Sequence, residues 1–220
     1  KAGDSMTVTS EKINVSIVAK EVAVEWTVDS NLTYTGTEKS VTAIYKDIKG
    51  ADVVLTVAEV NGLTAINAGE YTFVATNDDA NYTITNTQTT ITIAKAQVAA
   101  EWTVDSNLTY TGTEKTVTAI YKDVNGLDVV LTVAEKNGLT AINVGTYTFV
   151  ATNDDANYDL NANTETTIEI VAKEVAVEWT VDANLVYNGT EKTISAIYKD
   201  VNGLDVVLTV AEKNGLTAIN

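Results

Sequence analysis

The chain has 220 residues, of which 14 are Lys and 30 are Asp or Glu, and its formal net charge at pH 7 is −16. It contains no Cys, His, Pro or Arg, so the common ligands of zinc, haem and iron–sulfur clusters are missing, together with thiol nucleophiles and histidine bases. An acidic surface without Arg repels nucleic acid and anionic membranes, so neither is an expected partner.

Alternating apolar and polar residues predict short β-strands along the chain. The pattern begins at Val22–Val28, where Val22, Val24 and Trp26 share one face. Further strands are expected at residues 32–34, 40–46, 52–58, 69–76 and 82–94. Turn signals separate these strands. One is Asn61–Gly62, and another is Lys49–Gly50, which becomes Asn125–Gly126 in the second copy. Residues 53–63 are the single candidate for a short helix, although their β-branched side chains favour a strand.

The sequence is an array of near-identical repeats of about 76 residues. Residues 26–82 match residues 102–158 at 50 of 57 positions, and residues 102–143 match residues 179–220 at 37 of 42. We therefore expect an all-β tandem array of small antiparallel β-sandwich, Ig-like domains. A β-grasp-like unit with one short helix is the alternative. In either fold, the tryptophans at equivalent positions are expected in the cores: Trp26, Trp102 and Trp179.

The repeat boundaries follow from this alignment. Residues 21–96 and 97–173 are predicted to be two full repeats, and residues 174–220 a third, incomplete repeat that lacks the last two strands. Residues 1–20 resemble the last strand of a preceding copy. We interpret the sequence as a window of a longer array. The alternative is a complete subunit whose open end accepts the N-terminal strand of a neighbour.

Few side chains are candidates for chemistry. Clustered oxygens in a repeated loop are the ingredients of a calcium site, and an Asx-rich turn explains the same pattern. Calcium is therefore the one cofactor considered, and its candidate ligands are Asn77, Asp78, Asp79, Asn153, Asp154 and Asp155. Lysines in a strand recur near aspartates, which allows either a lysine–asparagine cross-link or a solvent-facing lysine: Lys46, Lys122 and Lys199. Most carboxylates recur on the predicted solvent face, as Glu25 does, so we expect no enzyme.

Three segments carry a family resemblance. LTYTGTEKSVTA at 32–43, the Gly-x-Tyr-Thr strand within 67–76 and DANYTITNTQTTITIAKA at 79–96 resemble the tandem Ig-like and MBG-type repeats of large bacterial or archaeal cell-surface proteins. The closing strand lacks a mid-strand glycine, and the chain lacks proline, which leaves the subfamily open. The resemblance implies an extracellular stalk or adhesin without enzymatic activity.

Three functions are consistent with these observations. The first is a stalk of a surface adhesin that projects a distal functional domain. The second is a subunit of an extracellular filament, assembled head to tail by strand complementation. The third is a repeated module that binds a glycan or a protein ligand. Expected partners are neighbouring repeats or copies of the chain itself. No apolar run is long enough to enter a membrane.

Overall fold

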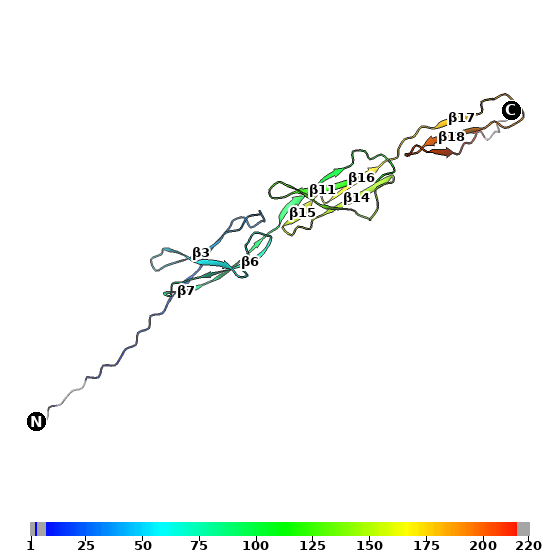
Figure 1. The fold of residues 1–220 in the computed structure, drawn as a ribbon. Helices are drawn as coiled ribbons and strands as arrows, with labels where there is room; N and C mark the ends of the chain where they lie inside the picture. The colour runs from blue at the N-terminus through cyan, green and yellow to red at the C-terminus, as the bar shows by residue number, and fades with distance from the viewer. Residues whose placement is uncertain (1–2, 4–7, 215–220) are drawn as a thin grey trace. The chain divides into compact units, whose positions relative to one another are not determined.

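The computed structural model describes residue 3 and residues 8–214, and this part of the chain contains strands and no helix (Figure 1). The first repeat contains β1 (Lys20–Ala23), β2 (Glu25–Val28), β3 (Val41–Lys46), β4 (Asp52–Val54), β5 (Thr56–Glu59), β6 (Gly69–Thr76), β7 (Tyr82–Thr85) and β8 (Gln88–Ile93). The second contains β9 (Ala96–Ala99), β10 (Glu101–Val104), β11 (Val117–Lys122), β12 (Asp128–Val130), β13 (Thr132–Glu135), β14 (Gly145–Thr152), β15 (Tyr158–Ala162) and β16 (Glu165–Ile170). The third contains β17 (Glu178–Val181), β18 (Ile194–Lys199) and β19 (Asp205–Leu208).

Small antiparallel sheets build each repeat, as the alternating pattern predicts. In the first repeat, one sheet has the order β2-β3-β4 and another the order β5-β6-β8. The second repeat has the same arrangement, with sheets β10-β11-β12 and β13-β14-β16. The chain is therefore an all-β array of tandem small domains, and the helix considered for residues 53–63 is instead β4, β5 and a turn.

One strand pair in the first repeat is parallel, which the sequence pattern did not predict. Lys20 of β1 lies opposite Tyr82 of β7, and the two strands run in the same direction. The stretch from residue 20 to 28 is broken at Val24, whose N–H donates to the carbonyl of Thr85 over 3.0 Å. The half before the break pairs with β7 and the half after it pairs with β3. This stretch thus connects two sheets.

Two other expected strands are interrupted. Residues 52–58 break at Leu55, which is buried and whose N–H donates to the carbonyl of Ala43. Residues 82–94 break at Asn86, where φ is 56°, in the left-handed region. Residues 32–34 form only an isolated bridge, between Thr33 and Ala94.

Alternation places the apolar side chains of the first repeat in two adjoining clusters. One contains Tyr45 and Leu55, and the other contains Phe73, Ile91 and Ile93. Trp26 and Val57 pack against both clusters. In the second repeat, the equivalents of Phe73, Ile91 and Ile93 form the same cluster, and Trp102 packs against it. The prediction that Trp26 and Trp102 belong to the core is confirmed.

The third tryptophan differs. Trp179 is 64% exposed, so its predicted core position is wrong for this structure. The reason is that, up to residue 214, the third repeat forms one sheet, β17-β18-β19, and none of the described residues supplies the second sheet that would cover it. The remaining residues of this predicted repeat, 215–220, lie outside the described residues.

The segment that precedes β1 forms no strand over residues 8–19. Val15 and Ile17 are 82% and 95% exposed. Residues 1–2 and 4–7, which were expected to belong to the same strand of a preceding copy, lie outside the described residues. The repeat boundaries at 21–96, 97–173 and 174–220 stay predictions.

The chain divides into two compact units. The first consists of Lys1–Gln97 together with Asp155–Asp159, and the second of Val98–Asp154 together with Leu160–Asn220. The five residues Asp155–Asp159 thus make their main contacts with the first 97 residues. Within the residues that the structure describes, no helix is long and apolar enough to cross a bilayer.

Candidate functional site

The loop considered for calcium is closed by its own side chains. The amide nitrogen of Asn77 donates to the carbonyl oxygens of Asp79 and Tyr82, at 2.8 and 3.0 Å. One carboxylate oxygen of Asp79 accepts two hydrogen bonds from Asn81, from the backbone N–H and from the side-chain amide. These contacts are those of an Asx-rich turn, in which polar side chains replace a ladder of backbone bonds.

The same loop recurs before β15, where the carboxylate of Asp155 accepts the N–H of Asn157 over 2.8 Å. Over residue 3 and residues 8–214, no group of three or more Asp, Glu, His or Cys side chains is placed to hold a metal ion. A calcium ion needs six to eight oxygens at once. The geometry thus favours the turn for both loops, and the candidate ligands stay a prediction to be tested with the metal.

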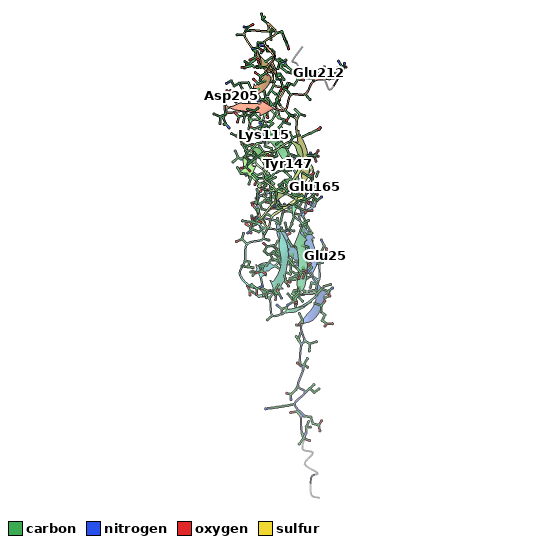
Figure 2. All side chains as sticks on the ribbon, turned by 90° about the vertical axis from the view of Figure 1, so that its right-hand side faces the viewer. Glu25, Lys115, Tyr147, Glu165, Asp205 and Glu212 are labelled. Atoms are coloured by element: carbon green, nitrogen blue, oxygen red, sulfur yellow. The ribbon has the colours of Figure 1, made fainter. Side chains whose placement is uncertain are left out.

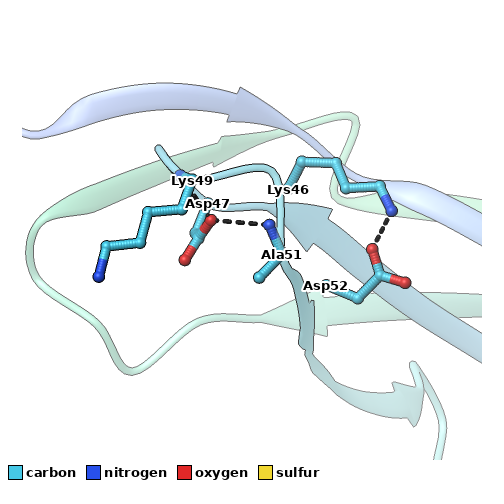
Figure 3. Close-up of polar contacts among 5 residues, drawn as sticks. All are labelled: Lys46, Asp47, Lys49, Ala51 and Asp52. Atoms are coloured by element: carbon cyan, nitrogen blue, oxygen red, sulfur yellow. Dashed lines mark hydrogen bonds and ion pairs between the residues drawn. The ribbon is translucent and has the colours of Figure 1, made fainter.

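A second carboxylate closes the turn between β3 and β4 (Figure 3). Asp47 Oδ1 accepts the backbone N–H of Lys49 at 2.7 Å and that of Ala51 at 2.8 Å. The hydrogen bond from Ala51 is the largest cause that lowers the pKa of Asp47, because it stabilises the charged form. Gly50 completes the turn with a φ of 83°, which only glycine adopts without strain.

In the same hairpin, Lys46 pairs with Asp52 and not with Asp47, its neighbour in sequence. Lys46 Nζ contacts Asp52 Oδ1 directly across β3 and β4, not the adjacent Asp47 (Figure 3). The hydrogen bond to Asp52 raises the pKa of Lys46, which keeps the amine protonated. Both side chains are about half exposed, at 47% and 54%. A protonated amine beside an exposed carboxylate forms an ion pair, so this geometry favours the solvent-facing lysine over the cross-link.

These pairs recur in the other repeats as Lys122–Asp128 and Lys199–Asp205. Sequence reasoning missed Asp52 and its equivalents as the partners. The signal was available: with a tight turn at residues 47–51, the antiparallel register places residue 46 opposite residue 52.

A groove of about 440 Å³ lies beside Lys39 in the first repeat, and one of about 390 Å³ lies beside Lys115 in the second. Lys115 is labelled in Figure 2. Lys39 is only 6% exposed, and its ammonium group donates to Thr35 Oγ1 over 2.9 Å. The carboxylate of Glu59 in the same groove accepts the N–H groups of Asn61 and Leu63. Both charged side chains are thus engaged in holding turns.

Hydrogen bonding also lowers the pKa of the Glu59 carboxylate, which keeps it charged. The N–H of Leu63 is the largest cause that lowers the pKa of Glu59, and the N–H of Leu139 does the same for the pKa of Glu135. A carboxylate with a lowered pKa is a weak base, and it is a poor general acid at neutral pH. Glu25, considered as a carboxylate on the solvent face, is exposed on β2. The arrangement stabilises β-turns.

Comparison with protein families finds the same unit twice. A family model for the MBG domain matches residues 27–97 and matches again at residues 103–173. Comparison with curated proteins and with solved structures finds no match. The two matched stretches contain the turns, ion pairs and grooves described above for the first two repeats. Because the two matches together cover more than half of the sequence, the chain belongs to the MBG domain family.

Proposed function

We propose that this chain is the structural repeat region of an extracellular surface adhesin, a stalk that holds a distal functional domain away from a cell. MBG repeat domains are typical of bacterial surface proteins and are generally non-catalytic. Near-identical copies suit this role, since a stalk needs length and copy number more than one special site. The polar side chains that recur in each repeat serve turns and strand pairs, which agrees with a structural role.

The observation that carries the proposal is the short connection between the first two repeats. β8 ends at Ile93 and β9 begins at Ala96, so only Ala94 and Lys95 lie between them. Ala94 is itself bonded, because its N–H donates to the carbonyl of Leu32 and its carbonyl accepts the N–H of Tyr34. Flexible linkers are rich in Gly and Ser and lack such bonds. A connection of this kind favours a stiff array.

The test is small-angle X-ray scattering of the chain and of versions with one or two further copies of residues 97–173. The maximum dimension is expected to grow linearly with copy number, by about 35–45 Å per copy at about 3.3 Å per strand residue. The matched control carries a ten-residue Gly/Ser spacer at every junction, between Ala94 and Lys95 and between the equivalent Val171 and Ala172, and its growth should be less than linear. A particle whose dimension barely changes when a copy is added contradicts the stalk.

A filament subunit is the second candidate, and one observation favours it. Val15 and Ile17 are 82% and 95% exposed, whereas the residues that match them in the next copy, Ile91 and Ile93, are 3% and 1% exposed. An extended apolar segment of this kind is suited to strand pairing with another copy of the chain. In the filament function, residues 8–18 complete the exposed sheet around Trp179 in a neighbouring copy.

Electron microscopy of the purified chain separates the two candidates. The filament function predicts regular fibres that disappear when residues 8–18 are deleted, and that also disappear in the double variant Val15→Ser, Ile17→Ser. The stalk function predicts monomers in all three proteins. The double substitution removes the apolar side chains and keeps the length of the segment, so it controls for the loss of chain.

A further inference from the structure

The loop that ends in Asn157 and Tyr158 makes contacts that loop closure does not require. Its residues Asp155–Asp159 belong to the first compact unit, although they follow β14 in sequence. Within that unit, the side-chain oxygen Oδ1 of Asn157 accepts the backbone N–H of Ala68 over 2.8 Å. Ala68 is separated from Asn157 by 89 positions, so this is a tertiary contact between two repeats of the sequence.

An aromatic contact accompanies the hydrogen bond. The ring of Tyr158 meets the ring of Tyr34 edge to face, with centroids 5.3 Å apart and planes inclined by 80°. Tyr158 is only 5% exposed. Edge-to-face pairs at this separation stabilise contacts beyond the burial of their area. The amide of Asn157 and the ring of Tyr158 thus both contact the first repeat.

The equivalent residues of the first repeat show what the loop does by itself. Asn81 donates two hydrogen bonds to Asp79 inside its own loop. The ring of Tyr82 packs against Tyr45, at 5.0 Å between centroids, and Tyr82 is more exposed than Tyr158. The loop therefore forms from its own sequence, and the contacts of Asn157 and Tyr158 with residues 68 and 34 are additional to it.

We propose that this Asn–Tyr pair is a docking element for a neighbouring MBG repeat, which it recognises through one backbone N–H and one tyrosine ring. Both recognised features are present in the first two copies. Tyr34 recurs as Tyr110, and the residue at position 68 changes to Val144, but the contact uses its backbone N–H and not its side chain. The element thus accepts any repeat of this family that has a tyrosine at the position equivalent to Tyr34.

This inference deepens the proposed function and rests on it, because docking between repeats matters to an array. It assigns a role to the Asn-Asp-Asp-Ala-Asn-Tyr motif, for which the sequence left an Asx-rich turn and a calcium site as alternatives. In a stalk, each copy of the motif would add a specific contact to the short covalent connection. The contact chemistry includes a hydrogen bond and an aromatic pair.

The experiment is hydrogen exchange of the Ala68 amide in the full chain, measured by nuclear magnetic resonance. Asn157→Ala removes the acceptor, so exchange at Ala68 is expected to become about 5–10-fold faster, as the loss of one hydrogen bond implies. Asn81→Ala, the same change in the equivalent loop, is the matched control and should leave Ala68 unchanged. Asn157→Asp keeps an acceptor oxygen and should preserve slow exchange.

Exchange at Ala68 that is equally slow in Asn157→Ala and in the parent overturns the proposal. Faster exchange in Asn81→Ala to the same extent also overturns it, because the effect would then be general loosening. The scattering test of the stalk is independent. If Ala68 is unaffected while the maximum dimension still grows linearly with copy number, the docking element is wrong and the stalk stands.

Discussion

The indole Nε1 of Trp26 donates a 2.9 Å hydrogen bond to the backbone carbonyl oxygen of Asn86. Asn86 occupies the turn between β7 and β8 in the left-handed region. The second repeat has the same contact, from Trp102 to Asn163 over 2.7 Å, with a φ of 55° at Asn163. In the first two repeats, the tryptophan near the start thus ties this late turn to the core, across about 60 residues of sequence.

Replacement of Trp102 by Ala is expected to destabilise the second repeat by about 3 kcal/mol, because it removes a large core side chain and the bond to Asn163. The matched control is Trp179→Ala, since Trp179 is 64% exposed and should change stability by less than about 0.5 kcal/mol. Urea unfolding followed by circular dichroism measures both variants. Equal free energies of unfolding for Trp102→Ala and the parent would show that the indole contributes nothing to the core.

The conformation of Asn163 gives a second prediction. Its φ of 55° suits Asn and Gly and strains a residue with an ordinary Cβ. Asn163→Ala should therefore cost about 1 kcal/mol, whereas Asn163→Gly should cost less. The carbonyl that Trp102 contacts is retained in both variants, so the difference reports the backbone alone. Equal free energies of unfolding for the Ala and Gly variants would contradict backbone strain at position 163.

Acid should weaken the turns that carboxylates close. The N–H of Leu127 is the largest cause that lowers the pKa of Asp123, and Asp47 and Asp200 have the same arrangement. A lowered pKa in the folded state means that the stabilisation is complete above the unfolded pKa, about 4. It is lost as pH falls through the lower, folded value. Asp123→Asn should be less stable than the parent at pH 7, and the difference should shrink below about pH 4 in urea unfolding.

The strand lysines are expected to give the opposite dependence of stability on pH. The hydrogen bond to Asp128 raises the pKa of Lys122, so its stabilisation is complete below the unfolded pKa of about 10.4 and is lost as pH rises through the higher, folded value. Lys122→Met should remove this decline at high pH.

If the lysine is an ion-pair partner, the intact mass of the chain must equal the mass of its sequence. A deficit of one water for each pair would show an amide cross-link instead.

Calcium at millimolar concentration is expected to leave the melting temperature almost unchanged, because Asn77 and Asp79 use their side chains to close their own loop. A site filled at a hundred times its dissociation constant would add about 2.7 kcal/mol of stability. Differential scanning calorimetry with calcium and with a chelator makes the comparison. A clear rise with calcium, abolished in Asp79→Asn, would establish a metal site in this loop.

The sequence by itself determined the elements and their repetition. Period-two alternation and the bounding turn residues predicted a strand at residues 69–76, and β6 has these bounds. It also predicted an all-β chain, because β-branched residues and glycine turns occur throughout. Local patterns suffice for these features, since a strand and its turns depend on a few neighbouring residues.

Only the tertiary structure decided which distant segments meet. Alternation assigns a side chain to a face, but it does not name the partner strand or its direction, so the parallel pairing of β1 with β7 was not predictable. For the same reason, Trp26 and Trp179 have equivalent sequence positions but different exposures, because burial requires a second sheet. Asn81 and Asn157 likewise close the same turn, and only Asn157 lies against the N–H of Ala68, because that contact depends on a segment 89 residues away.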